Sequence, residues 1–152
     1  MSSLRQFLAE GRLRRQTSNA VEIKNLLLVA ERDLADARVE GVTADRRFAT
    51  AYNAALQLAT AALRAEGYRT AGTGHHFTTL AVLTDILGAE MQSTADYLNA
   101  CRAKRNTVDY NGIGVANERD VRELIEEAEI LKTAMHAWLL RVHPGLIDEG
   151  GR

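Results

Sequence analysis

Residues 43–67 read TADRRFATAYNAALQLATAALRAEG and carry a start signal, a periodic stripe and a stop signal for one helix. Thr43 is a residue type that caps helix N-termini, and Gly67 accepts the left-handed backbone that ends a helix. Between them a stripe recurs at the three- and four-residue spacing of one helix face, formed by Phe48, Tyr52, Ala55, Ala59, Ala62 and Leu63. Because much of this stripe is alanine, a partner helix can approach it closely. The stretch therefore predicts a helix packed closely against a neighbour.

Helical patterns continue on both sides of this stretch. The segment from about 20 to 40 begins with a capping-box pattern, Asn19 with Glu22, and Gly41 is expected to end it. Another helix begins near Ala89, and Asn117 is expected to cap a last long helix that keeps its apolar period to Val142. Short helices are expected over residues 2–14 and around residue 80, residues 68–74 are expected to form a loop, and no strand pattern is found. Short connections between four substantial helices predict an all-α, up-and-down bundle of four to five helices.

The length, net charge and composition of the chain limit the class of protein. The 152 residues suit one domain, expected as an N-terminal short helix or arm (1–16), a helical bundle (17–143) and a loose tail (144–152). A net charge of −1 means that any nucleic-acid binding needs a local patch. The lone Cys101 fits a reducing cytoplasm, and no apolar run reaches the roughly 18 residues of a membrane span. No zinc spacing or phosphate-binding glycine motif occurs, so we expect no metal and no cofactor.

Residues 99–114, NACRAKRNTVDYNGIG, form the one segment whose composition asks for a chemical explanation. Arg102, Lys104 and Arg105 crowd three positive charges together and are the candidate phosphate-binding residues. On a helix, Arg102, Arg105 and Asp109 share a face with Asn106 beside them. The same face continues upstream as an apolar stripe of Met91, Ala95 and Leu98. An apolar seam that turns polar near the helix end can form a binding site, or its polar groups can simply pair with one another.

Two further basic clusters have plainer interpretations. Adjacent His75 and His76 point about 100° apart on a helix, so they chelate a metal poorly and are expected to cap the helix start or to contact a neighbouring loop. Arg12, Arg14 and Arg15 lie near the N-terminus, where we expect a solvated end of the chain.

Three segments of the sequence resemble the HEPN family of small helical-bundle proteins. They are AYNAALQLATAALRAEGY at residues 51–68, GHHF at 74–77 and KRNTVDY at 104–110, and the similarity extends over roughly residues 20–142. The pair Arg105-Asn106 matches the polar start of the family's R-x4-6-H motif. The resemblance implies a bundle that often forms homodimers, with the motifs of two protomers facing each other across a cleft.

The resemblance also implies function. Many HEPN proteins are metal-independent ribonucleases, including toxins of toxin–antitoxin pairs, while others bind RNA or nucleotides, and some pair with a small nucleotidyltransferase. Carried over to this chain, Arg105 would contact a phosphate and Asn106 would orient the site. The family's histidine is expected at position 110, 111 or 112, where this sequence has Tyr110, Asn111 and Gly112. An ordinary phenol, with a pKa of about 10, is a poor general base at neutral pH.

Three hypotheses remain open. The first is a ribonuclease that uses Arg105, Asn106 and Tyr110, with Asp109 as a further candidate. The second, which the missing histidine favours, is a weakly catalytic or non-catalytic module that binds RNA or a nucleotide at a dimer cleft. The third is a structural interaction protein in which Arg105 and Asp109 form a buried ion pair. An antitoxin or a nucleotidyltransferase is a possible protein partner under the resemblance.

Overall fold

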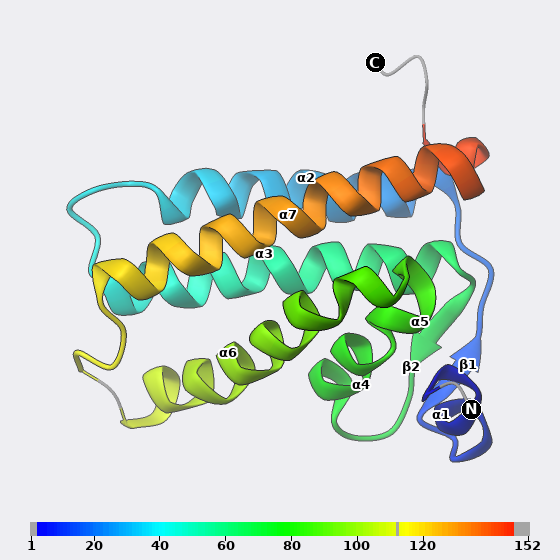
Figure 1. Cartoon of the computed structure of the whole chain (residues 1–152), viewed down its shortest axis with the longest axis horizontal. Helices are drawn as coiled ribbons and strands as arrows, with labels where there is room; N and C mark the ends of the chain where they lie inside the picture. Colours follow the sequence, from blue (N-terminus) through cyan, green and yellow to red (C-terminus); the bar gives the residue numbers. More distant parts are fainter. Residues whose placement is uncertain (1–2, 112, 148–152) are drawn as a thin grey trace.

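The structure confirms an all-α bundle. The computed structural model describes residues 3–111 and 113–147, and for residues 108–111 it describes the backbone alone. Successive long helices run in alternating directions along the molecule, with α6 crossing obliquely over α3 (Figure 1). The four long helices are α2 (Ala20–Ala37), α3 (Ala44–Ala65), α6 (Gln92–Asn111) and α7 (Glu118–Val142). The short elements are α1 (Ser3–Ala9), β1 (Leu13–Arg15), β2 (Tyr68–Thr70), α4 (His75–Ala81), α5 (Leu83–Leu87), η1 (Ala89–Met91) and η2 (Pro144–Leu146).

Side-chain caps set the starts of three long helices. Asn19 Oδ1 accepts a hydrogen bond from the Glu22 N–H at 2.9 Å, and Thr43 caps α3 in the same way. Asn117 and Asp120 form a reciprocal capping box at the start of α7. The box predicted for α2 is half formed, because the Glu22 carboxylate instead accepts hydrogen bonds from the Ser18 hydroxyl and the Arg64 guanidinium.

The N-terminal segment differs from the expectation of one helix over residues 2–14. Helix α1 ends at Ala9, the chain turns through Gly11 at φ +75°, and β1 then pairs antiparallel with β2. The partners are Leu13 with Thr70, Arg14 with Arg69, and Arg15 with Tyr68. The expected loop after α3 therefore begins with a strand. Strands of three residues are too short to show an alternating pattern, so this pairing between distant segments has no sequence signal.

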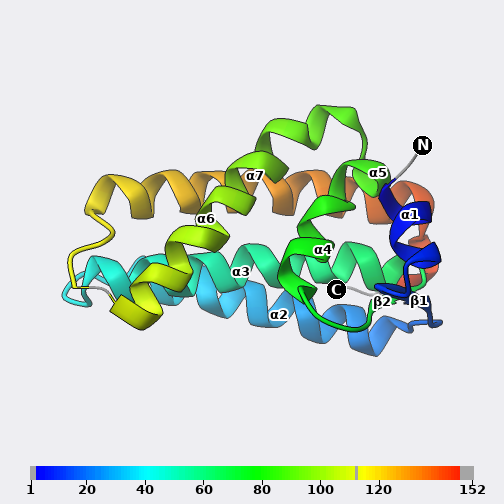
Figure 2. The same ribbon diagram turned by 90° about the horizontal axis from the view of Figure 1, so that it is seen from below.

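Helix α2 also ends earlier than expected. Its C-cap is Arg38, and Gly41 follows in the loop at φ +95°. Helix α1 and the β1–β2 pair lie together at one end of the bundle, beside α4 (Figures 1 and 2). This end positions the polar residues that are described in the next section.

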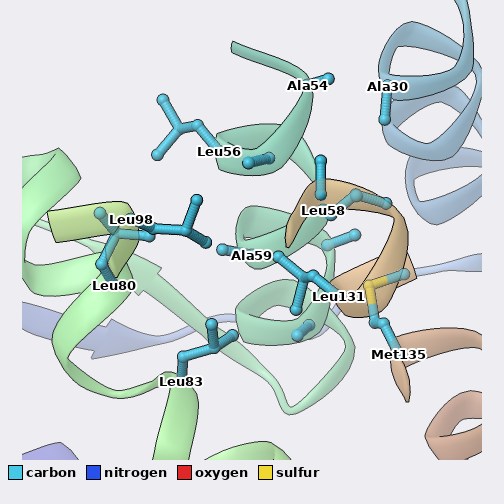
Figure 3. Packing of buried hydrophobic residues seen from close by; sticks show 14 of the residues in the cluster. Ala30, Ala54, Leu56, Leu58, Ala59, Leu80, Leu83, Leu98, Leu131 and Met135 are labelled. Carbon is cyan, nitrogen blue, oxygen red and sulfur yellow. The ribbon is translucent and has the colours of Figure 1, made fainter. Parts of the chain in front are cut away.

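Helix α3 lies at the centre of the core. Leu58 and Ala59 of α3 lie between Leu80, Leu83 and Leu98 on one side and Leu131 and Met135 of α7 on the other (Figure 3). Seven of the thirteen buried residues of α3 are alanine, which lets α2 and α7 approach its backbone. The expected small-residue stripe is therefore confirmed as a packing surface. Within the described ranges, no helix has the length and apolar character that crossing a membrane requires.

Close packing of α2 gives a first test. Ala30 is fully buried on α2, whereas Ala35 on the same helix is exposed. Ala30→Leu forces extra volume into the core, and we expect it to lower the free energy of unfolding by about 1–3 kcal/mol. The matched control Ala35→Leu should change it by no more than about 0.5 kcal/mol. Urea denaturation of both variants measures the difference, and equal effects would contradict the close-packing argument.

Candidate functional site

The seam on α6 turns from apolar to polar as the sequence predicted. Met91, Ala95, Leu98 and Cys101 are buried against the core. Arg102 directly follows Cys101 and is the first of the helix's basic residues, one turn beyond Leu98. The apolar half of the helix therefore anchors it, and the polar half reaches the surface beside α4.

A surface pocket lies between α4 and α6. Its volume is about 410 Å³, and we call it the α4–α6 pocket, lined by Gly74, His75, His76, Phe77, Arg102 and Asn106. Arg102 Nε donates to Asn99 Oδ1 at 2.9 Å, which holds the side chain, and its guanidinium carbon lies 5.6 Å from the Phe77 ring centroid. Two of the residues predicted for the site, Arg102 and Asn106, therefore meet in one pocket.

Arg105 is not among the residues that line this pocket, and it lies instead near Tyr52. Its guanidinium carbon is 5.8 Å from the ring centroid of Tyr52, which is fully buried on α3. Desolvation raises the pKa of Tyr52 to about 12, although the positive charges of Arg102 and Arg105 act in the opposite direction. The Tyr52 phenol is therefore protonated at neutral pH and can hydrogen-bond without carrying charge.

His76 is the residue that sequence reasoning undervalued. Its Nδ1 lies 3.4 Å from Tyr52 Oη, and the two ring centroids are 5.9 Å apart. Burial lowers the pKa of His76, and the positive charges of Arg105, Arg102 and His75 lower the pKa further. The imidazole is therefore uncharged at neutral pH, beside two permanent cations. The resemblance of the GHHF segment (74–77) to the HEPN family was the one sequence signal for His76. Helical periodicity within the segment could not show that His76 lies near α6.

His75 makes the loop contacts that were expected for the histidine pair. Its Nδ1 lies 2.7 Å from Thr70 Oγ1, and its Nε2 contacts the carbonyl oxygen of Gly72. Both ring nitrogens thus face the loop that leads from β2 into α4. Among the side chains that the structure describes, no group of three or more His, Cys, Asp and Glu residues could hold a metal ion.

Lys104 is separated from the other two predicted cations. Its Nζ donates to Asp120 Oδ2 at 2.8 Å and lies 5.6 Å from the Phe48 ring centroid. This hydrogen bond, together with one from the Asn117 N–H, lowers the pKa of the Asp120 carboxyl. Because Lys104 and Arg102 are two positions apart, about 200° of helix rotation directs them to different faces. The three predicted cations therefore do not form one cluster, because Arg102 faces α4 whereas Lys104 faces the start of α7.

Two predicted residues fall in the part of α6 whose side chains are not described. The backbone of Asp109 and Tyr110 belongs to α6, whereas the predicted roles of their side chains, and the proposed Arg105–Asp109 ion pair, lie outside the described residues.

The charge state of His76 gives a second test. Because the folded state lowers its pKa, the unfolded state binds the proton more readily, and stability should fall as the pH drops through the histidine range. His76→Gln should remove this part of the loss between about pH 8 and pH 5. The measurements are an NMR titration of the His76 ring and denaturation of both proteins across the range. A ring that titrates at or above the ordinary histidine value would contradict the description.

Comparison with known proteins extends the geometric description. The model of the SAV_6107-like HEPN family matches residues 39–135, a range that includes all of α3, the α4–α6 pocket and most of α7. No curated protein and no solved structure matches the chain. The match covers more than half of the sequence, and the helical bundle agrees with it. The chain therefore belongs to the HEPN family, within its SAV_6107-like group.

Proposed function

We propose that this HEPN protein binds RNA through a phosphate group held in the α4–α6 pocket. The observation that carries the proposal is the meeting of Arg102 and Asn106 of α6 with His75 and His76 of α4 around one cavity. An arginine guanidinium presents a planar fork of donors that matches phosphate oxygens. The Asn106 amide adds both a donor and an acceptor at the same rim.

Local charge supports an anionic ligand. The whole chain has a net charge of −1, so it offers no general attraction for nucleic acid. Arg102 and Arg105 nevertheless bring two positive charges close to His76, where they add to the effect of burial in lowering its pKa, and these charges favour an anionic ligand. A phosphate would be stabilised by these charges, and a 2′-hydroxyl could hydrogen-bond to the neutral imidazole.

Binding of a short RNA tests this proposal. We expect Arg102→Ala to weaken binding of a fluorescent single-stranded RNA and to lower the slope of log K against log salt by about 1. The control Arg119→Ala removes an equal charge from the exposed face of α7, where Arg119 pairs with Glu123, and should leave binding unchanged. Fluorescence anisotropy over a range of salt concentrations gives both quantities. Equal binding by wild type and Arg102→Ala would refute the phosphate site.

A Lys104 variant is measured in the same experiment. The sequence included it among the phosphate-binding residues, but its ion pair with Asp120 favours a structural role. Lys104→Ala is therefore expected to resemble Arg119→Ala in RNA affinity, and a loss equal to that of Arg102→Ala would return Lys104 to the binding site.

A second candidate function, cleavage of RNA, is favoured by the position of His76. If His76 Nδ1 carries the ring proton and donates a hydrogen bond to Tyr52 Oη, then Nε2 keeps a lone pair that can accept a proton. His76 would take the proton of the 2′-hydroxyl while that oxygen bonds to phosphorus, and the bond from phosphorus to the 5′-oxygen would break. The leaving oxygen would take a proton from water, which yields a 2′,3′-cyclic phosphate and a 5′-hydroxyl. Arg102 and Arg105 would stabilise the charge on phosphorus.

Four proteins test cleavage on a mixed RNA substrate. Because no histidine occupies the family's motif position, we expect the wild type to cleave weakly, and His76→Ala and Arg105→Ala to abolish the residual activity. Tyr110→His supplies a base at the motif position and should increase cleavage. Product analysis should find cyclic phosphate termini. Unchanged cleavage in His76→Ala would exclude this role, and a wild type without any cleavage would leave binding as the function.

The assembly belongs to the proposal as well. A homodimer that brings two copies of the α6 motif together, and an antitoxin or nucleotidyltransferase partner, stay predictions. Tyr110 and Asp109 likewise stay candidate residues of the site.

A further inference from the structure

Arg12 reaches the edge of the α4–α6 pocket from the opposite end of the sequence. It lies in the turn between α1 and β1, outside residues 39–135 that match the family. Its Nη2 donates to Thr78 Oγ1 of α4 at 3.1 Å, and a Cβ atom at Gly74 would be 3.7 Å from the same nitrogen. Arg12 therefore borders the pocket at Gly74, although we expected a solvated end of the chain here.

Arg12 and Arg102 share one aromatic neighbour. The guanidinium carbons of both residues lie 5.6 Å from the ring centroid of Phe77, which is 38% exposed. The Arg12 guanidinium also lies 4.3 Å from the Phe7 ring, and the Phe7 and Phe77 rings meet edge to face at 6.5 Å. Two arginines from distant parts of the chain therefore lie near the same exposed ring.

The backbone holds Arg12 in place. Its N–H donates to the Phe7 carbonyl at 2.8 Å, and its own carbonyl accepts from the Ala71 N–H at 2.9 Å. Buried Leu13 follows and begins the strand pair with β2. One carboxylate, that of Glu10, lies 3.6 Å from Nη1. The arm is thus docked by Phe7, Leu13 and the strand pair, which leaves the cation of Arg12 in a fixed place at the surface.

We propose that the N-terminal arm extends the α4–α6 pocket into a site for two successive phosphates of single-stranded RNA, with Arg102 holding one and Arg12 the next. This inference rests on the proposed RNA binding and adds its substrate class, an oligonucleotide instead of a mononucleotide. Single-stranded nucleic acid is commonly held by cations along its backbone together with exposed aromatic rings that contact its bases. Phe77 lies near both cations and is partly exposed, so it can contact the edge of an unstacked base.

The experiment compares a hexauridylate with uridine monophosphate as probes of the full chain. Arg12→Met keeps an unbranched apolar stem between Phe7 and Phe77 and removes the charge. The control Arg14→Met changes an exposed position of β1 two residues further along the chain, and it removes the same charge without touching the pocket. We expect Arg12→Met to weaken hexauridylate binding severalfold, to lower its salt slope by about 1, and to leave uridine monophosphate binding unchanged. Arg14→Met should bind both probes as the wild type does.

A second variant separates charge from docking of the arm. Arg12→Lys keeps the positive charge on which attraction of a phosphate depends, and should regain part of the hexauridylate affinity and the salt slope that Arg12→Met loses. If Arg12→Met and Arg12→Lys lose both probes equally, Arg12 acts by holding the arm, and the two-phosphate site is overturned. If Arg102→Ala weakens hexauridylate binding while Arg12→Met behaves as Arg14→Met, this inference fails and the proposed function stands. If Arg102→Ala also has no effect, the proposed function itself fails.

Discussion

The burial of α3 against several neighbours is the constraint on which the rest of this structure depends. A helix in the middle of a bundle must present small residues wherever the backbone of another helix approaches, and α3 presents alanine at seven buried positions. Large side chains occupy the remaining gaps, with Phe48 and Tyr52 both almost completely buried. Because Tyr52 is both a core residue and the neighbour of Arg105 and His76, the packing of α3 also fixes a side chain that these two residues contact.

The position of the site follows from how α6 is anchored. Its first half is buried through Leu98 and Cys101, so the direction of the helix is fixed before the arginines begin. The helix then brings Arg102 against Phe77 of α4 and turns Lys104 toward Asp120 of α7. Residues that are adjacent in the sequence therefore serve different contacts. The pocket gains its second side from α4, which the β1–β2 pair and the loop contacts of His75 hold in place.

Electrostatics would link the proposed phosphate binding and the proposed proton transfer in this pocket. The arginines that suit the pocket to a phosphate also lower the pKa of His76, because each positive charge disfavours a protonated imidazole. A bound phosphate would offset those charges and raise the affinity of His76 for a proton. The arginines thus keep His76 neutral in the empty pocket, whereas a bound phosphodiester would stabilise its protonated form. Tyr52, protonated because it is buried, takes part in this arrangement without adding charge.

The amino-acid pattern established the helices, because capping residues, glycines and the 3.6-residue period act over short stretches of chain. It located the caps at Asn19, Thr43 and Asn117 and the buried face of α7, and it found Arg102 and Asn106 as residues of one polar surface. The tertiary structure alone showed that Lys104 leaves this surface, that His76 joins it from α4, and that Arg12 borders it from the N-terminal arm. These three outcomes depend on contacts between segments far apart in the sequence, where no local periodicity or spacing rule applies. The short β1–β2 pair escaped detection for the same reason, since its stability comes from pairing and from the burial of Leu13 rather than from the preference of either three-residue segment.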